Sequence, residues 1–492
     1  MGIIIKQSIK GSIWSYLGVV IGFFTTTYLY SEYLSPEIVG LFGLLLSYAI
    51  LSAQFSSLGI NGVTNRLFPY FRNKETGHNG YLFIAFSVIS IGFFLFLITY
   101  FLFSPKLIES NIEKSKLFAD YVYLLIPLTF FTLLFNVLDI YNKLLYNAVL
   151  GTFLQDVFQR VLIFIVVVAY ALQLINIQTL IFLFVFATSA KGIYIFIYLL
   201  LKGELNLRPR LSFITKDLRK EMISVAIYSI LTGASGSIVF SLDKIIVNQY
   251  LGLSSAGIYT MAFFFGSLVI IPSRPLLRIS GTLISDAWKR NDRNYIHDIY
   301  SRSSLNQFII ALFLFGGIWI NIDNIQVILG PDYEGVKWVI FFIGLANVVV
   351  MLAGANGQVI GFSEYYKVSL YFLLILIVLV VAAMYIFIPL WGITGAAIAI
   401  ATVMFMNNLM RYLYILFKFK MQPFSLKFII VPVAFLVAWG ASSFINQQQL
   451  VVDIFIRSTL FTIVFGAIIL LTKVSDDVNN VVETVLLKFK KR

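Results

Sequence analysis

The chain has 492 residues, of which 60% are hydrophobic and only 12% are charged, and its mean hydropathy is +0.91. Soluble domains carry about 25% charged residues, so this composition excludes a soluble enzyme and indicates an all-α integral membrane protein. The chain has no Cys and only two His, which excludes disulfides and Cys-based metal sites and argues against a His-based one. We therefore expect no metal and no cofactor.

Fourteen apolar segments follow one another along the chain, each long enough to cross a hydrocarbon core of about 30 Å as a helix. The segments cover residues 11–33, 38–63, 80–104, 118–142, 147–172, 176–200, 222–249, 254–284, 304–321, 335–360, 366–388, 391–416, 427–445 and 451–472. A barrel strand would span about ten residues of alternating polarity, so these uninterrupted runs predict about 14 transmembrane helices.

The net charge of +13 lies mainly in the loops and fixes the orientation of the spans. With the N-terminus inside, 25 Lys and Arg fall in inside segments, 4 fall in outside segments and seven fall within spans, which accounts for all 36. Cytoplasmic loops are rich in Lys and Arg, so both termini are predicted to be cytoplasmic. The same distribution explains the positive charge without a nucleic-acid partner.

An internal repeat divides the chain. Tyr33, Leu34 and Gly40 reappear as Tyr250, Leu251 and Gly257, an offset of 217 residues that equals six spans. A parallel repeat of this kind predicts two six-helix lobes around a central cavity. We expect an N-terminal lobe over residues 1–205, a C-terminal lobe over 206–420, and two further helices with a basic tail over 421–492.

Seven cations lie inside predicted spans beyond the first three residues of each, although a charge at the bilayer centre costs about 2.5–3.5 kcal/mol on insertion scales. They are Arg160, Lys191, Lys244, Arg274, Arg278, Arg411 and Arg457. Apart from Asp120 and Asp453 in the first three residues of their spans, only three Asp lie in such stretches, namely Asp139, Asp156 and Asp243. An excess of buried cations points to an anionic substrate.

The five deeper cations are the candidate substrate-binding residues, because they could hold phosphate or pyrophosphate by charge-assisted hydrogen bonds. They are Arg160, Lys191, Lys244, Arg274 and Arg278. The alternative is local neutralisation: Asp156 and Arg160 are spaced i,i+4, and Asp243 could pair with a cation on a neighbouring span. Arg411 and Arg457 lie nearer the span ends, where we expect them to snorkel to the interface.

Two segments are candidates for a gate or hinge. Pro272 and Pro275 flank Arg274 and predict a kink in the eighth span, which suits either a gate or a plain bend. Gly354 and Gly357 in the tenth span favour close helix packing over a moving hinge. Asp139 and Lys143 are expected to form an interfacial pair.

Motifs of soluble chemistry are missing from the sequence. It contains no GxxxxGK[ST], HExxH or GxSxG pattern, and no loop is large enough to hold a glycosyltransferase or polymerase domain. We therefore expect a transporter and not an enzyme.

Three features resemble the polysaccharide-exporter branch of the multidrug/oligosaccharidyl-lipid/polysaccharide (MOP) superfamily, the Wzx-type O-antigen flippases. Asp243-Lys244 is followed by Gly257-Ile258-Tyr259, and the stretch from Gly392 to Ala399 opens the twelfth span. The third feature is the plan of fourteen spans with a duplicated lobe, which extends the resemblance over essentially the whole chain.

This resemblance implies a MATE-like V-shaped fold and alternating access in a bacterial cytoplasmic (inner) membrane. The implied substrate is an undecaprenyl-pyrophosphate-linked oligosaccharide, such as an O-antigen unit, and the implied partners are this substrate, membrane lipids and a coupling ion, H⁺ or Na⁺. Two alternatives remain in the same superfamily, a cation-coupled multidrug exporter and a peptidoglycan lipid II flippase. A drug exporter would favour acidic residues deep in spans one to three, which have none away from their ends. A non-transporting scaffold would not need buried cations.

Overall fold

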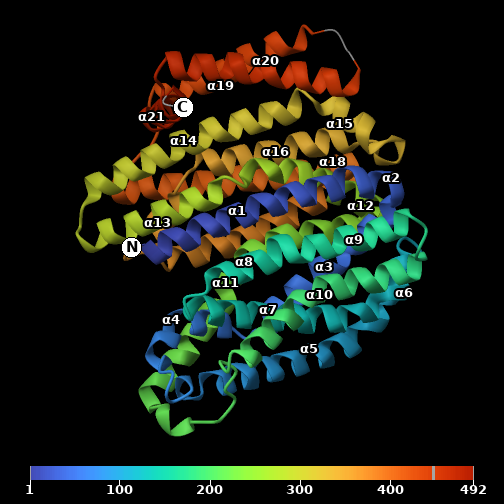
Figure 1. The fold of residues 1–492 in the computed structure, drawn as a ribbon, viewed down its shortest axis with the longest axis vertical. Helices are drawn as coiled ribbons and strands as arrows, with labels where there is room; N and C mark the ends of the chain where they lie inside the picture. Colours follow the sequence, from blue (N-terminus) through green and yellow to red (C-terminus); the bar gives the residue numbers. More distant parts are fainter. Residues whose placement is uncertain (1, 446–448, 491–492) are drawn as a thin grey trace. The chain divides into compact units, whose positions relative to one another are not determined.

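The computed structural model describes residues 2–445 and 449–490, with side chains for residues 10–230, 241–445 and 449–484. All regular structure within these residues is helical (Figure 1). The backbone packs into two compact units, unit 1 over Met1–Gly257 and unit 2 over Ile258–Arg492. The predicted all-α membrane fold is confirmed.

Unit 1 contains the helices up to the start of α12. They are α1 (Gly2–Phe24), α2 (Ser31–Tyr33), α3 (Pro36–Ser56), α4 (Ile60–Phe71), α5 (Tyr81–Asn111), α6 (Lys116–Tyr121), α7 (Leu125–Leu144), α8 (Ala148–Phe153), α9 (Gln159–Ala171), α10 (Ile177–Leu201) and α11 (Lys216–Leu251). Two π-helical turns, Thr25–Tyr30 and Leu154–Phe158, interrupt otherwise continuous spans. Such turns loosen the local hydrogen-bond ladder and are often found at functional sites.

The boundary helix α12 (Leu253–Ser267) leads into unit 2. Unit 2 then contains α13 (Ser273–Lys289), α14 (Arg293–Trp319), α15 (Ile322–Leu329), α16 (Val336–Leu352), α17 (Asn356–Gly361), α18 (Val368–Phe419), α19 (Lys427–Ser443), α20 (Leu450–Leu471) and α21 (Asp476–Lys490). The helix α18 is broken at Trp391 and Gly392, whose backbone angles are not helical, so it holds the eleventh and twelfth predicted segments.

Each of the fourteen predicted segments overlaps a helix, but their exact number as membrane spans is not confirmed. In the described residues, nine helices are long and apolar enough to cross a membrane, or ten if the bent pair α14–α15 is one span. The helices α16 and α19 are shorter, with 17 residues each. The number fourteen therefore stays a prediction.

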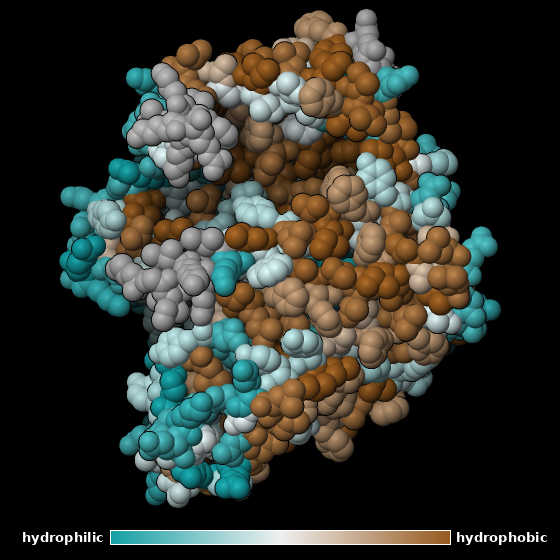
Figure 2. All heavy atoms as spheres, in the orientation of Figure 1, coloured by the Kyte–Doolittle hydropathy of each residue, from teal (hydrophilic) through white to brown (hydrophobic). Residues whose placement is uncertain are grey.

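Apolar side chains cover much of the visible surface, as lipid-facing helices require (Figure 2). On α5, Phe94, Phe101 and Leu102 are 62%, 65% and 69% exposed. Water would make such exposure unfavourable, whereas lipid tails solvate these side chains. The chain is a multi-pass membrane protein.

The two glycines of the internal repeat pack against each other within unit 1. A Cβ added at Gly40 would lie 2.2 Å from the Leu253 carbonyl oxygen, and one at Gly257 would lie 1.8 Å from the Pro36 oxygen. Leu253 follows Pro36 by the same 217 residues, so the contact is reciprocal, as a twofold relation between the two copies requires. Only glycine allows the backbones of α3 and α12 to approach this closely.

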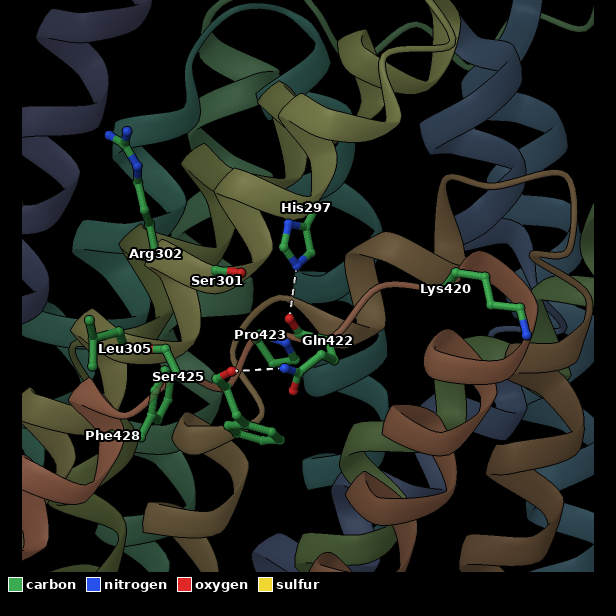
Figure 3. A pocket seen from close by; sticks show the side chains of 10 residues that line it. His297, Ser301, Arg302, Leu305, Lys420, Gln422, Pro423, Ser425 and Phe428 are labelled. Carbon is green, nitrogen blue, oxygen red and sulfur yellow. Dashed lines mark hydrogen bonds between the residues drawn. The ribbon is translucent and has the colours of Figure 1, made fainter.

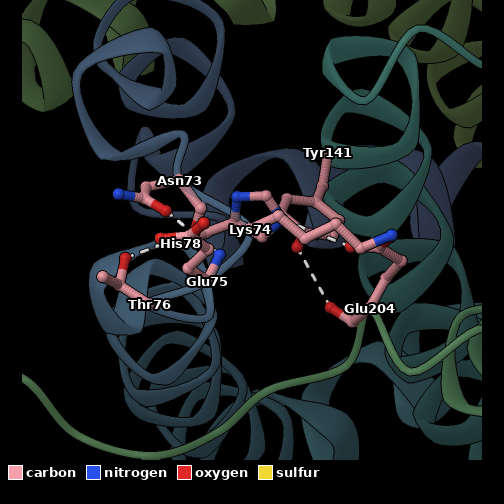
Figure 4. Close-up of polar contacts among 7 residues, drawn as sticks. All are labelled: Asn73, Lys74, Glu75, Thr76, His78, Tyr141 and Glu204. Atoms are coloured by element: carbon pink, nitrogen blue, oxygen red, sulfur yellow. Dashed lines mark hydrogen bonds and ion pairs between the residues drawn. The ribbon is translucent and has the colours of Figure 1, made fainter.

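The connector between α10 and α11 is fastened to the turn between α4 and α5 (Figure 4). The Glu204 carboxylate lies 3.3 Å from Lys74 Nζ and 3.2 Å from Nε2 of the buried His78. The Tyr141 hydroxyl donates a hydrogen bond of 3.0 Å to the Glu204 carbonyl oxygen. These contacts join α7, α10 and the α4–α5 turn at one end of unit 1.

Helix α11 belongs to unit 1 by its packing, although it follows the lobe boundary predicted at residue 205. It packs along α3 and α4, where a Cβ at Gly59 would lie 2.1 Å from the Ala226 carbonyl oxygen. The division of the chain into lobes at residues 205 and 420 depends on the sequence repeat and stays a prediction.

The reciprocal glycine contact predicts a steep cost for adding a methyl group. We expect Gly257→Ala to destabilise the protein by about 1–3 kcal/mol, because overpacking forces the two backbones apart. Thermal unfolding of the purified protein in detergent, followed by size-exclusion chromatography, measures the effect. Gly466→Ala is the matched control, since no atom lies within 4 Å of a Cβ there. Equal melting temperatures for both variants would contradict the contact.

Candidate functional site

Helix α1 packs closely against the π-helical turn Leu154–Phe158. Ser15 donates a hydrogen bond of 2.6 Å to the Asp156 carboxylate, and the Arg160 guanidinium donates one of 2.5 Å to the Gly18 carbonyl oxygen. A Cβ at Gly18 would lie 2.0 Å from the Asp156 oxygen, and one at Gly22 would lie 2.4 Å from an Arg160 nitrogen. Asp156 and Arg160, both singled out in the sequence, therefore contact α1.

Lys191 on α10 lies among carboxylates of unit 1. Asp139 and Asp156 are both close enough for charge–charge interaction with its ammonium group, and its Nζ stands 4.8 Å from the Phe135 ring centroid. Asp139 is buried and pairs with Lys143, as expected from their spacing. The Phe135 ring and the negative charge of the two aspartates both stabilise the half-buried Lys191 cation.

Asp243 and Lys244 sit on α11. Asp243 is fully buried, its carboxylate accepts a hydrogen bond of 2.7 Å from the Lys244 backbone N–H, and neither side chain is without a partner. The three predicted cations of unit 1 thus each have partners inside that unit.

In unit 2, the eighth predicted span is interrupted where the two prolines fall. Helix α12 ends in a 3₁₀ turn, Leu268–Ile270, and α13 begins after Pro272, with Pro275 in its first turn. Arg274 and Arg278 project from successive turns of α13 and are exposed. Neither guanidinium has an ion pair or hydrogen bond with a residue whose side chain is described.

The tenth predicted span breaks at Gly354, between α16 and α17. Gly354 has φ +54°, and a Cβ there would lie 2.4–2.7 Å from three atoms of Ser304 on α14. Gly357 faces α18, where a Cβ would lie 3.3 Å from an Arg411 guanidinium nitrogen. Both glycines are placed at close helix contacts, and their role as a hinge stays a prediction.

The remaining two cations differ from each other. Arg457 is neutralised: its Nε lies 2.7 Å from the buried Asp453 carboxylate, which also accepts a hydrogen bond of 2.7 Å from Asn324. Arg411 is half-buried, with no ion pair or hydrogen bond to the described part of the chain. The expectation that both side chains snorkel to the membrane interface does not distinguish these two environments.

In unit 1 Lys191 lies within electrostatic influence of Asp139 and Asp156 without forming an ion pair with a described residue. In unit 2 Arg274 and Arg278 lie one turn apart on α13. Sequence reasoning missed Ser15 and Gly18 as partners of Asp156 and Arg160. A regular spacing of Gly11, Gly18 and Gly22 along α1 is the signal that could have found this close helix contact.

A cavity of about 360 Å³ lies elsewhere in unit 2, between α14 and the α18–α19 connector (Figure 3). His297 faces the connector and lies 2.8 Å from the Gln422 carbonyl oxygen. None of the predicted substrate-binding residues lines this cavity.

Known structures with the same fold are membrane transporters. The lipid II flippase MurJ, in its inward closed conformation, matches with a TM-score of 0.77 and 14% identity over 94% of this chain and 99% of that one. An inward-facing multidrug resistance MATE family transporter of the MOP superfamily matches with a TM-score of 0.63 and 15% identity over 83% of this chain and 97% of that one. No curated protein matches the sequence.

The fold is therefore of the MurJ and MATE type. Residues 8–274 match the family model described as polysaccharide biosynthesis protein. This match covers more than half of the chain, which belongs to that family, and the resemblance found in the sequence is confirmed.

The electrostatic influence of Asp156 on Lys191 predicts energetic coupling between them. We expect Asp156→Asn and Lys191→Gln each to destabilise the protein, because each removes an opposite charge from the surroundings of the other. The double variant should be more stable than the sum of the two effects predicts, by about 0.5–3 kcal/mol. A double-mutant cycle on thermal unfolding measures this coupling.

The exposed pair Asp323–Lys337, with N–O distance 2.8 Å, provides the matched control. The same cycle there should give a coupling of about 0–1 kcal/mol, because solvent screens surface ion pairs. Strict additivity for Asp156 and Lys191 would show that the two groups do not interact.

Proposed function

We propose that the protein is a flippase that moves an undecaprenyl-pyrophosphate-linked oligosaccharide across a bacterial cytoplasmic membrane. The oligosaccharide would be an O-antigen or another surface polysaccharide unit. The single observation that carries this proposal is the surplus of arginine and lysine inside spans of a chain from the polysaccharide biosynthesis protein family. Multiple guanidinium groups suit a pyrophosphate, because each can donate two parallel hydrogen bonds to its oxygens.

Alternating access is the mechanism that we infer. Two six-helix lobes, residues 1–205 and 206–420, would open in turn to each side, with both termini in the cytoplasm. The sugar head and pyrophosphate would cross inside the protein while the lipid tail stays in the bilayer. The substrate must also be released, so its cations should be spread out and partly hydrated. A coupling ion, H⁺ or Na⁺, would drive the cycle.

The multidrug exporter is less well supported by the charges. Cationic drugs would be attracted by unpaired carboxylates, but Asp156 is bonded to Ser15 and Asp139 is paired with Lys143 in the described structure. Lipid II also carries a pyrophosphate, so a lipid II flippase would use the same positive charges. The two candidate functions therefore differ only in the substrate that is moved.

The test is flux in proteoliposomes. We expect the protein to move a fluorescent undecaprenyl-pyrophosphate oligosaccharide faster than empty liposomes do. The rate should fall at least about tenfold in Arg274→Gln/Arg278→Gln, because a hydrogen bond to a charged group contributes about 1.5–3 kcal/mol. The control Arg290→Gln/Arg293→Gln removes two charges from the end of α13 and the start of α14 and should retain the rate.

Two outcomes would contradict the proposal or its substrate, and a third would contradict only the assigned residues. No flux in the wild type, together with efflux of a cationic dye, would indicate a drug exporter. Flux of fluorescent lipid II without flux of the oligosaccharide would indicate a lipid II flippase. Flux that survives loss of both arginines would keep the function and remove these residues from the site.

A further inference from the structure

The connector between α10 and α11 follows a fixed path over the surface of unit 1. Near its start, Glu204 is held by contacts to the α4–α5 turn (Figure 4). A Cβ at Gly80 in that turn would lie 2.9 Å from the Arg208 carbonyl oxygen and 2.8 Å from the Arg210 backbone nitrogen. The connector therefore packs its backbone directly against the turn, an approach that only glycine allows.

The far end of the connector is held by an aromatic contact. The Phe213 ring lies 5.1 Å from the ring of Phe71, a buried residue at the end of α4. Two residues later, the Thr215 side chain accepts a hydrogen bond of 3.2 Å from the Leu218 N–H and caps α11. Residues 204–215 are thus fixed at both ends, although they contain no α-helix.

Positive charge is concentrated along this fixed segment and the first turn of α11. The cations are all exposed, and they are Arg208, Arg210, Lys216, Arg219 and Lys220. Their side-chain nitrogens make no ion pair or hydrogen bond within the described part of the chain. Asp217 is the one acid between residues 208 and 220, so five cations against one acid leave an excess of four positive charges.

Large apolar side chains are exposed beside these cations. Leu207 and Leu211, which flank the two arginines of the connector, are 42% and 62% exposed. Figure 2 shows hydrophilic residues gathered over this end of unit 1, at the lower left, next to hydrophobic ones. Water makes such apolar exposure unfavourable, whereas a membrane interface accommodates apolar side chains together with the stems of Arg and Lys. The surface therefore offers charge for headgroups and apolar contact for the lipid beneath them.

The positive-inside rule accounts for the sign of these charges but not for their arrangement. A loose basic loop would orient the spans equally well. Here packing holds the connector in place, which reduces the entropy lost when a partner binds. The predicted topology puts the connector on the cytoplasmic side, where the leaflet has a negative surface potential and each nearby Lys or Arg contributes about 1 kcal/mol to binding.

We propose that the connector and the first turn of α11 form a binding surface for anionic phospholipids of the cytoplasmic leaflet. The cations would contact headgroup phosphates, and Leu207 and Leu211 would insert at the boundary with the acyl chains. These lipids would be bound at the protein surface and not transported, since the surface contains none of the candidate substrate-binding residues. The inference goes beyond the proposed flippase function and does not depend on it.

A fluorescent reporter on the connector tests this surface. The chain has no Cys, so Ser212→Cys, at an exposed position, can carry a single bimane label. The labelled full-length protein is placed in phosphatidylcholine nanodiscs with doxyl-labelled phosphatidylglycerol or doxyl-labelled phosphatidylcholine, and quenching measures how often each lipid lies at the connector. We expect the anionic lipid to be enriched about threefold or more over the zwitterionic one, and the enrichment to fall as the salt concentration rises.

Two sets of four substitutions separate this surface from the general positive charge of the protein. The enrichment should fall to about one in the first set, because the charge that attracts the headgroups is removed. That set is Arg208→Gln/Arg210→Gln/Lys216→Gln/Lys220→Gln. The enrichment should persist in the control set, which removes four exposed cations from predicted inside segments of unit 2, Arg290→Gln/Arg293→Gln/Lys367→Gln/Lys427→Gln.

Equal quenching by the two lipids in the wild type would overturn the proposal, as would the same loss of enrichment in both sets. Displacement of the anionic lipid by inorganic phosphate at constant ionic strength would identify a site for free oxyanions and overturn the assignment to lipid. These measurements do not involve transport, so failure of the flippase proposal would leave them interpretable.

A glycine variant tests the arrangement with every charge retained. Gly80→Ala places a methyl group against the connector backbone, so it should displace the two arginines and lower the enrichment about twofold or more. Gly203→Ala is the matched control, because its φ of +68° is as left-handed as the +74° of Gly80 but no atom lies within 4 Å of a Cβ there. Size-exclusion chromatography selects the folded fraction of both variants. Equal enrichment in the two would contradict the role of the fixed connector.

Discussion

The cost of a charge inside the bilayer is the constraint on which this structure depends. A chain whose composition is dominated by apolar residues keeps seven cations in its predicted spans, and each must be matched by an acid, a carbonyl, water or a ligand. Arg457, whose Nε lies 2.7 Å from the Asp453 carboxylate, shows the first solution. Lys191 has two aspartates within electrostatic influence and the Phe135 ring beside it. Arg160 at the Gly18 carbonyl oxygen shows the second. The three other arginines, all in unit 2, show neither.

Close backbone approach is the second constraint, because lipid provides no hydrophobic force to press helices together. Glycines therefore appear where helices must touch. Gly18 and Gly22 allow α1 to reach Asp156 and Arg160, and Gly40 with Gly257 closes the reciprocal contact of the repeat. Glycine also positions charged side chains. A side chain at Gly18 would keep α1 away from the turn Leu154–Phe158, so the Ser15–Asp156 hydrogen bond and the Arg160 contact could not form.

The sequence predicts the helices well, because a run of about 20 apolar residues has few alternatives in a membrane. It also predicts the interruption at Pro272 and Pro275, since proline acts through local backbone chemistry. The break at Gly354 was not predicted, because the glycines there favour close packing as well as bending. It does not reveal the partners of the charges. The Ser15–Asp156 contact joins residues 141 positions apart, and whether Arg411 or Arg457 has a partner depends on side-chain directions that no spacing fixes.

The charged side chains of the two units differ in how strongly they restrain their helices. A neutralised charge cluster holds its helices together, since moving one helix away would leave a bare charge in a medium of low dielectric constant. Unit 1, with Asp156 bonded to α1 and Lys191 between two aspartates, should therefore resist internal rearrangement. The arginines on α13 and α18 carry no such restraint, and α13 and α17 both begin at backbone breaks.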